Sequence, residues 1–456
     1  MNDLHVLHDL LPRLAVVFCL WAALQTRVTA ADWAEWLGAE RDSVWRESGI
    51  VERFPTNGLP VAWRVKVGAG YSAPAVAKGR VFLTDRVAGS PWNQPKNPYM
   101  DRTSIPGVER VLCLDERTGK LLWQHEYDCP YNLSYPSGPR AMPQVSDGRV
   151  YTVGADGHLR CLDAKTGKLV WSRHYPTDFH AATQTWGVAS SPLIDGDRIF
   201  CLVGGEGTSV IALDKRTGKE LWRALTTKEP GYSSPILIKA GGREQLVLWD
   251  SLAVTALDPR AGTLLWTQPF PTKMAHAIGT PRRLGDRLFV SSFFDGSMML
   301  KLDAKEPGAS VVWKIKGRNE NNPESLQSLM GTPFLEGGHI YGVCGYGQLR
   351  CIKADTGERV WETLVPTTSD LKPARWGTAF LVKNGDRFFI WNEKGDLILA
   401  KLSPAGYEEI SRQHLLEPTN LAGSRPVVWS HPAFANGHVL VRNDQELVRV
   451  DLRKKR

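Results

Sequence analysis

Short runs of alternating apolar and polar residues, separated by Gly, Asp and Asn turns, fill most of this chain. Such runs are typical of β-strands rather than helices. One pattern recurs: the stretch ALDKRTGKELW that ends at Trp222 reappears in similar form over residues 113–123 and 161–171. Degraded copies end at Trp266, Trp313 and Trp361, so successive tryptophans lie 44 to 51 residues apart. A period of this length built from short strands predicts a repeat architecture.

A second pattern lies between these tryptophans. It consists of a small residue, a proline, a turn and a β-rich run, as in residues 191–200. Eight such units begin at or near Pro74, Pro143, Pro192, Pro235, Pro281, Pro333, Thr378 and Pro432. Each unit then holds four strands, of which the first carries the proline and the fourth ends in tryptophan. We therefore predict an all-β, eight-bladed β-propeller of four-stranded antiparallel blades.

The two ends of the chain predict how the ring closes. The eighth unit stops after its third strand, whereas Leu59–Val67 has the pattern of a lone fourth strand with its Trp63. Pairing these strands would complete the last blade and remove an unpaired edge. We expect one propeller over residues 59–452, an N-terminal segment 31–58 that packs across the ring, and a basic tail 453–456. Length alone would suggest about three domains, but the repeat overrides that expectation.

The recurring residues have structural explanations. The Asp214 carboxylate can accept backbone N–H bonds two residues on and close a turn, and Gly218 supplies the positive φ that such a turn requires. A tryptophan is large enough to fill the space between neighbouring blades. We assign this blade-docking role to Trp63, Trp123, Trp171, Trp222, Trp266, Trp313 and Trp361.

Residues 1–30 have the pattern of a secretory signal. Arg13 precedes the apolar run Leu14–Leu24, and a small-residue cleavage site ends at Ala30. The run of eleven residues is too short to span a bilayer, which argues against an uncleaved anchor. Lipidation at Cys19 is disfavoured because the bulky Phe18 precedes it. We therefore expect cleavage near Ala30, a periplasmic or secreted protein, and no transmembrane segment afterwards.

The cysteines and the net charge add few constraints on the function of the protein. Of seven cysteines, six remain after the signal, and none forms a C-x-x-C pair of the kind that holds zinc. Most are explained as small buried thiols, and Cys344 and Cys351, which flank one hairpin turn, are the pair to test for a disulfide. A net charge of +8 is mild and dispersed, so it affects solubility more than partner choice and does not predict nucleic-acid binding.

The candidate site is one end of the central channel. The first strand of each blade lines that channel, so the residues just before each unit start should ring one mouth. These are Tyr71, Arg140, Trp186, Tyr232, His276, Gln327, Arg375, Trp376, Trp429 and His431. Concave surfaces that combine aromatic rings with a few polar groups are typical binding sites. The alternative is that these bulky side chains plug a wide channel or stack between blades.

One insertion departs from the repeat. Residues 86–110, between strands two and three of the first blade, contain four prolines and the aromatic residues Trp92 and Tyr99. Long loops without secondary structure are usually functional or disordered. We expect an ordered lid over the same mouth.

No catalytic constellation and no metal ligand set is predicted. His276 and His431 are polar candidates at the mouth, but no pattern places a carboxylate beside either. The stretch Gly204–Gly207 is a hairpin tip without a following helix, so it is not a phosphate-binding loop.

The Asp-x-x-Thr-Gly-x-x-x-Trp pattern resembles the repeat of the pyrroloquinoline-quinone (PQQ)-like β-propellers, over roughly residues 60–452. The opening from Asp32 to Pro74 resembles exported propellers of this kind in planctomycete-like bacteria. The resemblance is specific for the fold, and the fold hosts several functions.

Two branches of that family imply different functions. Quinoprotein dehydrogenases hold PQQ and Ca²⁺ over the channel and oxidise alcohols or sugars. This chain lacks the adjacent cysteines that they commonly carry, and none of its residues aligns with their catalytic Asp or their Glu and Asn calcium ligands. The BamB-like branch is an eight-bladed, non-catalytic scaffold, and it matches better in blade number and length. It differs in the missing lipobox and the long first-blade loop.

We therefore expect an exported, non-catalytic binding or scaffolding propeller without a cofactor, with a protein partner or a small or polymeric ligand at the propeller face. The alternative is a PQQ- and Ca²⁺-dependent oxidoreductase with its site near Trp186, Arg375, Trp376 and Trp429. Binding of a surface polysaccharide or a peptide by the same aromatics is a third possibility. A cluster of carboxylate and Asn oxygens at the mouth would favour the enzyme.

Overall fold

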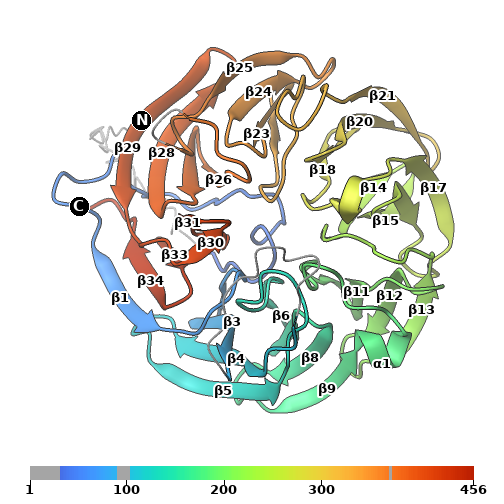
Figure 1. Cartoon of the computed structure of the whole chain (residues 1–456), viewed down its shortest axis with the longest axis horizontal. Helices are drawn as coiled ribbons and strands as arrows, with labels where there is room; N and C mark the ends of the chain where they lie inside the picture. Colours follow the sequence, from blue (N-terminus) through green and yellow to red (C-terminus); the bar gives the residue numbers. More distant parts are fainter. Residues whose placement is uncertain (1–30, 90–102, 369–371, 456) are drawn as a thin grey trace, which may run out of the picture.

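The computed structural model describes residues 31–89, 103–368 and 372–455. Its strands form a closed ring of eight four-stranded antiparallel sheets, which confirms the predicted propeller (Figure 1). The first strand of every blade begins one residue after the predicted unit start. The signal segment 1–30 and the loop residues Trp92 and Tyr99 lie outside the described residues.

The first four blades follow one another along the chain, and neighbouring strands in each sheet are consecutive in sequence. Their strands are β2 (Ala75–Ala77), β3 (Arg80–Ala88), β4 (Gly107–Asp115) and β5 (Leu121–Asp128); β6 (Gln144–Ser146), β7 (Arg149–Val153), β8 (His158–Asp163) and β9 (Leu169–His174); β10 (Leu193–Asp195), β11 (Arg198–Leu202), β12 (Val210–Asp214) and β13 (Glu220–Ala224); and β14 (Ile236–Ala240), β15 (Arg243–Trp249), β16 (Ala253–Leu257) and β17 (Leu264–Pro269).

Blades five to eight complete the ring. Their strands are β18 (Arg282–Leu284), β19 (Arg287–Ser292), β20 (Gly296–Leu302) and β21 (Ala309–Ile315); β22 (Phe334–Glu336), β23 (His339–Val343), β24 (Leu349–Lys353) and β25 (Arg359–Thr363); β26 (Ala379–Asn384), β27 (Arg387–Asn392), β28 (Asp396–Ser403) and β29 (Gly406–His414); and β32 (Ala433–Ala435), β33 (His438–Arg442), β34 (Glu446–Asp451) and β1 (Val61–Lys66). The connections contain a short helix α1 (Tyr175–Phe179), a 3₁₀ turn η1 (Lys273–Ala275) and a hairpin of β30 (Asn420–Ala422) with β31 (Arg425–Val427).

The N-terminal strand closes the ring as predicted. Strand β1 pairs antiparallel with β34, with Val65 opposite Leu447, and so supplies the fourth strand of the last blade. Figure 1 shows the two strands, blue and red, side by side near the C-terminus. No sheet of the ring is left as an incomplete blade among the described residues.

The repeated tryptophans form the seams between blades. The indole N–H of Trp171 donates to the Lys215 carbonyl of the next blade at 2.9 Å. The ring lies against Gly218, whose φ is +67°; a Cβ there would sit 2.6 Å from the indole. The same bond to the next blade is made by Trp63, Trp123, Trp222, Trp313 and Trp361. Trp266 is the exception, because its indole N–H donates to Gln245 of its own blade.

The first-blade insertion is shorter than predicted. Strands β3 and β4 extend their pairing as far as Ala88 opposite Gly107. Residues 86–88 and 107–110 therefore belong to the sheet, because the β3–β4 ladder continues beyond the length of the corresponding strands in the other blades. The loop proper spans residues 89–106, most of it outside the described residues.

The six cysteines in the described ranges are buried and free. The Cys344–Cys351 pair forms no disulfide. In the β23–β24 hairpin the residue opposite Cys351 is Tyr341, and Cys344 lies beyond the end of β23. The thiol of Cys344 instead accepts the Gln327 backbone N–H at 3.3 Å. Within the same ranges, no helix has the length and apolar character needed to cross a membrane.

The N-terminal segment crosses the ring, as the blue trace in the middle of Figure 1 shows. Its backbone bridges Val76 of the first blade through Trp33 and Lys383 of the seventh through Val44. Between these points the largely buried Arg41 donates to Gln144 Oε1 and to the carbonyls of Pro192 and Pro235, at 3.1 to 3.4 Å. One segment thus ties together blades that are far apart in the sequence.

A second arginine holds this segment from the ring side. Arg282, at the start of the fifth blade, donates to the backbone carbonyls of Arg41 and Asp42 at 3.2 and 2.5 Å. Burial lowers the pKa of Arg41 to about 10, and the nearby Glu35 carboxylate partly offsets that shift. A buried cation satisfied by carbonyls and a carboxylate is costly to leave without partners. The segment is therefore a fixed plug of the channel.

Candidate functional site

A pocket lies on the mouth side of this plug. Eight of the ten predicted mouth residues line it: Tyr71, Arg140, Trp186, Tyr232, His276, Trp376, Trp429 and His431. They come from the loops that lead into successive blades, so the pocket is a property of the whole ring. It encloses about 1120 Å³ of free space, part of it open to solvent. The remaining lining residues are Trp36, Tyr135, Ala189, Ser234, Ile278, Leu329, Met330 and Phe380.

Aromatic contacts organise one wall. Trp186 packs edge-on against Tyr232 with ring centroids 5.8 Å apart, and its ring lies 4.9 Å from His276. His276 in turn stacks on Phe294 at 4.9 Å. Burial lowers the pKa of His276 to about 4, so its imidazole is neutral near pH 7. The wall therefore presents uncharged ring faces to the cavity.

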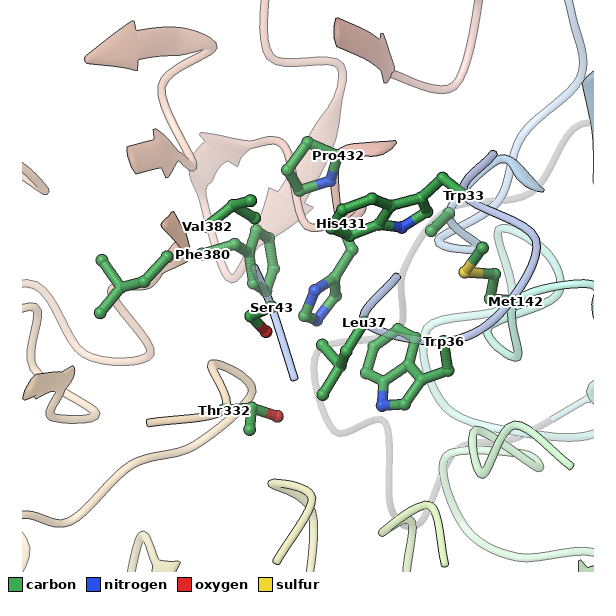
Figure 2. Close-up of a pocket in the computed structure, with 12 residues that line it drawn as sticks. Trp33, Trp36, Leu37, Ser43, Met142, Thr332, Phe380, Val382, His431 and Pro432 are labelled. Atoms are coloured by element: carbon green, nitrogen blue, oxygen red, sulfur yellow. The ribbon is translucent and has the colours of Figure 1, made fainter. Parts of the chain in front are cut away.

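The floor comes from the plug. The indole of Trp36 donates to Thr280 Oγ1 at 2.8 Å and meets the His431 ring edge-on at 4.4 Å. Figure 2 shows His431 between Trp36 and Phe380, whose ring lies 3.7 Å away. Burial lowers the pKa of His431 to about 3. The floor is thus apolar and uncharged, and its depth is set by residues outside the repeat.

Arg140 lies at the mouth, but its guanidinium N–H groups already donate to carbonyl oxygens of the protein. Its guanidinium donates to the carbonyls of Ser134, Tyr135 and Gly138, and it lies 5.0 Å above the Tyr71 ring. The side chain therefore holds the 134–138 loop and one aromatic face in place. Burial raises the pKa of the Tyr71 phenol, which stays protonated at neutral pH.

Two predicted mouth residues do not line the pocket. Gln327 is buried and bridges two loops, accepting from the Gly317 N–H and donating to the Phe293 carbonyl. Leu329 and Met330, closer to the blade start, take its place in the lining. Arg375 is half exposed and forms an ion pair with Glu320 at 2.7 Å while lying over the Trp376 ring.

A buried carboxylate, that of Glu393, contacts Trp429 of the lining without lining the pocket itself. Glu393 pairs with Arg425 of the β31 strand and accepts the indole N–H of Trp429 at 3.2 Å. Burial raises the pKa of Glu393, and the Arg425 charge opposes that rise. Its oxygens are occupied by these donors and by the Thr378 N–H. The group therefore positions Trp429 and the β30–β31 hairpin.

The lining does not match the ligands that Ca²⁺ prefers. Ca²⁺ takes six to eight oxygens, largely from carboxylates and amides. The described side chains that line the pocket include no Asp, Glu or Asn, and their oxygens are Tyr and Ser hydroxyls. The arrangement can bury an apolar or aromatic group and offer it a few neutral hydrogen-bonding partners.

Comparisons with known proteins agree with this fold. A family model described as outer membrane protein assembly factor BamB matches residues 108–363, which is more than half of the chain. No curated protein matches at a significant level.

Several solved structures share the architecture. BamB from Moraxella catarrhalis is 16% identical, with a TM-score of 0.53, over 87% of this chain and 99% of that one. Quinohemoprotein alcohol dehydrogenase from Comamonas testosteroni is 12% identical, with a TM-score of 0.61, over 93% and 81%. The computationally designed protein Ika8 is 10% identical, with a TM-score of 0.53, over 86% and 100%. Identities this low show the fold alone.

Proposed function

We propose that this chain, which belongs to the BamB family of PQQ-like β-propellers, is a non-catalytic binding protein that holds an apolar segment of a protein partner in its channel mouth. The observation that carries the proposal is the aromatic pocket at the channel mouth, to which eight of the predicted mouth residues contribute. Rings from several blades converge there, and such concave apolar surfaces with few polar groups suit side-chain binding.

The electrostatics of the pocket support a neutral, apolar occupant. Both histidines of the lining have lowered pKa values and are uncharged near pH 7. The arginine in the lining, Arg140, is satisfied by three backbone carbonyls. An aromatic or aliphatic side chain would lose water on entering and leave no charge of the pocket without a partner.

We also propose that the protein works outside the cytoplasm. The support is the signal pattern of residues 1–30 and the family description, which names an outer membrane protein assembly factor. Binding a partner during assembly at a membrane needs no cofactor, and none is proposed.

A PQQ-dependent oxidoreductase is the second candidate. The open aromatic pocket could accept a planar ring system, and this is the observation in its favour. The donor set of the lining argues against the Ca²⁺ that accompanies PQQ in the quinoprotein branch.

Peptide selection tests the first candidate. Random peptides displayed on phage would be selected against the mature chain, and their binding measured by fluorescence polarisation. We expect selected peptides to carry aromatic or long aliphatic anchors and to lose at least about tenfold in affinity in a W186A/W376A double variant, since anchors in apolar pockets dominate such interfaces. L121A, which removes an exposed side chain on the outer strand β5, should leave affinity unchanged. Peptides that bind the double variant as well as the parent would contradict the proposal.

A titration tests the second candidate. Purified mature protein would be titrated with PQQ and Ca²⁺ while tryptophan fluorescence is followed, with a dye-linked oxidation assay on alcohols and sugars. The binding proposal predicts no saturation in the micromolar range and no turnover. Saturable binding with turnover would instead establish that the protein is a PQQ-dependent oxidoreductase.

A further inference from the structure

A cluster of three potential metal ligands lies apart from the pocket. Cys129 follows β5 of the first blade, whereas Asp156 and His158 lie in the β7–β8 hairpin of the second. The thiol sulfur, one carboxylate oxygen and one imidazole nitrogen all lie within 4.8 Å of one another. We propose that these three side chains bind a thiophilic divalent d-block ion of the Zn²⁺ type.

The spacing of the ligand atoms fits such an ion. Cys129 Sγ and His158 Nδ1 are 3.7 Å apart. Two ligands bound tetrahedrally to Zn²⁺ through Zn–S of about 2.3 Å and Zn–N of about 2.0–2.1 Å would be separated by about 3.5 Å. The pair is therefore close to coordination distance already. Thiolate and imidazole ligands select Zn²⁺-like ions over Ca²⁺ or Mg²⁺.

Neighbouring groups hold two of the ligands in position. The hydroxyl of Thr183 donates to Asp156 Oδ1, and His174 Nε2 lies 3.6 Å from Asp156 Oδ2. The His158 ring stacks on His174 with centroids 4.0 Å apart, and it packs against Tyr127 at 5.2 Å. Such outer contacts orient ligands in known metal sites. The nearly parallel His174 ring, tilted by 18°, serves here as a support and not as a fourth ligand.

Metal binding at this cluster should depend on pH. The thiolate is the form of Cys129 that coordinates a metal, so the thiol must release its proton on binding and affinity should increase with pH.

Access to the cluster is through the carboxylate side. Cys129 is fully buried, whereas the Asp156 and His174 side chains keep 27% and 25% of their surface exposed. An ion can thus reach the carboxylate first and then the thiol. The other five cysteines of the described ranges have no such group of ligands near them.

Cobalt titration of the purified mature chain is the test. Co²⁺ replaces Zn²⁺ in such sites, and its bond to a thiolate produces a charge-transfer absorption band in the near ultraviolet. We expect one Co²⁺ per chain with this band, displacement by Zn²⁺, and tighter binding at pH 8 than at pH 6. C129A should abolish the band, and D156N should weaken binding by at least about tenfold. C161A, which removes a buried thiol from β8 of the second blade, is the matched control and should change neither.

Two results would overturn the proposal. One is an unchanged cobalt band in C129A, and the other is the lack of saturable Co²⁺ or Zn²⁺ binding tighter than about 100 μM. If C129A fails to fold by circular dichroism, D156N decides, because this side chain is partly exposed and its loss does not empty the core. Peptide binding at the channel mouth is measured separately, so the two proposals fail independently.

Discussion

Tryptophans at the blade seams and tryptophans at the channel mouth show two uses of one residue. At the seams, rings such as Trp171 are nearly buried and donate to a carbonyl of the next blade. At the mouth, Trp186 and Trp376 are partly exposed and line a cavity. The seam residues belong to the repeat, and the mouth residues do not. Position relative to the repeat therefore separates structure from candidate function, whereas residue type does not.

Trp266 departs from the seam pattern. It occupies the repeat position but donates to Gln245 of its own blade. In the next blade Gly308 does not contact its ring, whereas a glycine lies against the ring at five other seams: Trp63, Trp123, Trp171, Trp222 and Trp313. Trp361 also lacks a glycine contact but still donates to the Ser403 carbonyl of the next blade, so the glycine alone does not decide which acceptor the indole finds.

Removing the closing strand should have the largest effect on the seams. Deletion of Leu59–Val67 takes away the β1–β34 ladder and the Trp63 seam together. We expect a loss on the order of 5 kcal/mol or more, most of the stability of a typical domain. Thermal and urea unfolding measure it, with R64A as a control that keeps the ladder. Unchanged unfolding would mean that the ring does not depend on this strand.

A single seam tryptophan should come next. W171A removes a nearly buried ring and its hydrogen bond to Lys215. Truncation of a buried aromatic costs about 3–5 kcal/mol, which should appear as a lower urea midpoint with an unchanged slope. A loss below about 1 kcal/mol would contradict the packing role of the seam.

A lower pH should reduce stability through His431 at the mouth and not through the seam tryptophans. His431 has a pKa of about 3 in the folded protein, whereas the ordinary pKa of a histidine is 6.5, so the unfolded chain binds more protons between these values. Its contribution to stability is complete above pH 6.5 and is lost as the pH falls toward 3. Between pH 7.5 and 5, we expect the unfolding free energy of H431F to fall by about 1–2 kcal/mol less than that of the parent protein.

The same scan on W171A serves as the control, because an indole does not titrate. Identical acid dependence in H431F and the parent protein would show that His431 is not buried and neutral in solution.

The smallest change in stability should come from a mouth tryptophan. W186A removes a partly exposed ring from a cavity wall, and the expected loss is less than about 1 kcal/mol. Chemical unfolding measures it beside W171A under the same conditions. A loss as large as that of the seam variant would mean that the mouth rings are structural, which is the alternative raised by the sequence.

The sequence predicts the ring because the repeat is written in local patterns. Turn residues and strand alternation recur in each blade, so blade starts can be placed to within one residue. The mouth residues follow from the same register for most blades. Gln327 does not line the pocket, because the loop before blade six reaches the channel closer to the blade start, through Leu329 and Met330.

Other parts of the site depend on long-range paths. Trp36 becomes the pocket floor only because the N-terminal segment enters the channel, and its sequence signal is an aromatic residue outside the repeat. The Cys129 cluster combines residues from two blades, so no ligand spacing within one segment announces it. Contacts of this kind are set by tertiary packing.

Ring closure also has a consequence for timing. The two strands that complete the last blade span residues 61–66 and 446–451, so nearly the whole chain must be available before they can meet. Trp63 can dock early, because its partner Glu116 lies in the first blade. Strand β1 would then remain docked on that blade, with the edge that pairs with β34 unpaired, until residues 446–451 have been synthesised. A chain that is synthesised from its N-terminus would thus spend most of its folding as an open arc, and pairing between such distant segments is slow.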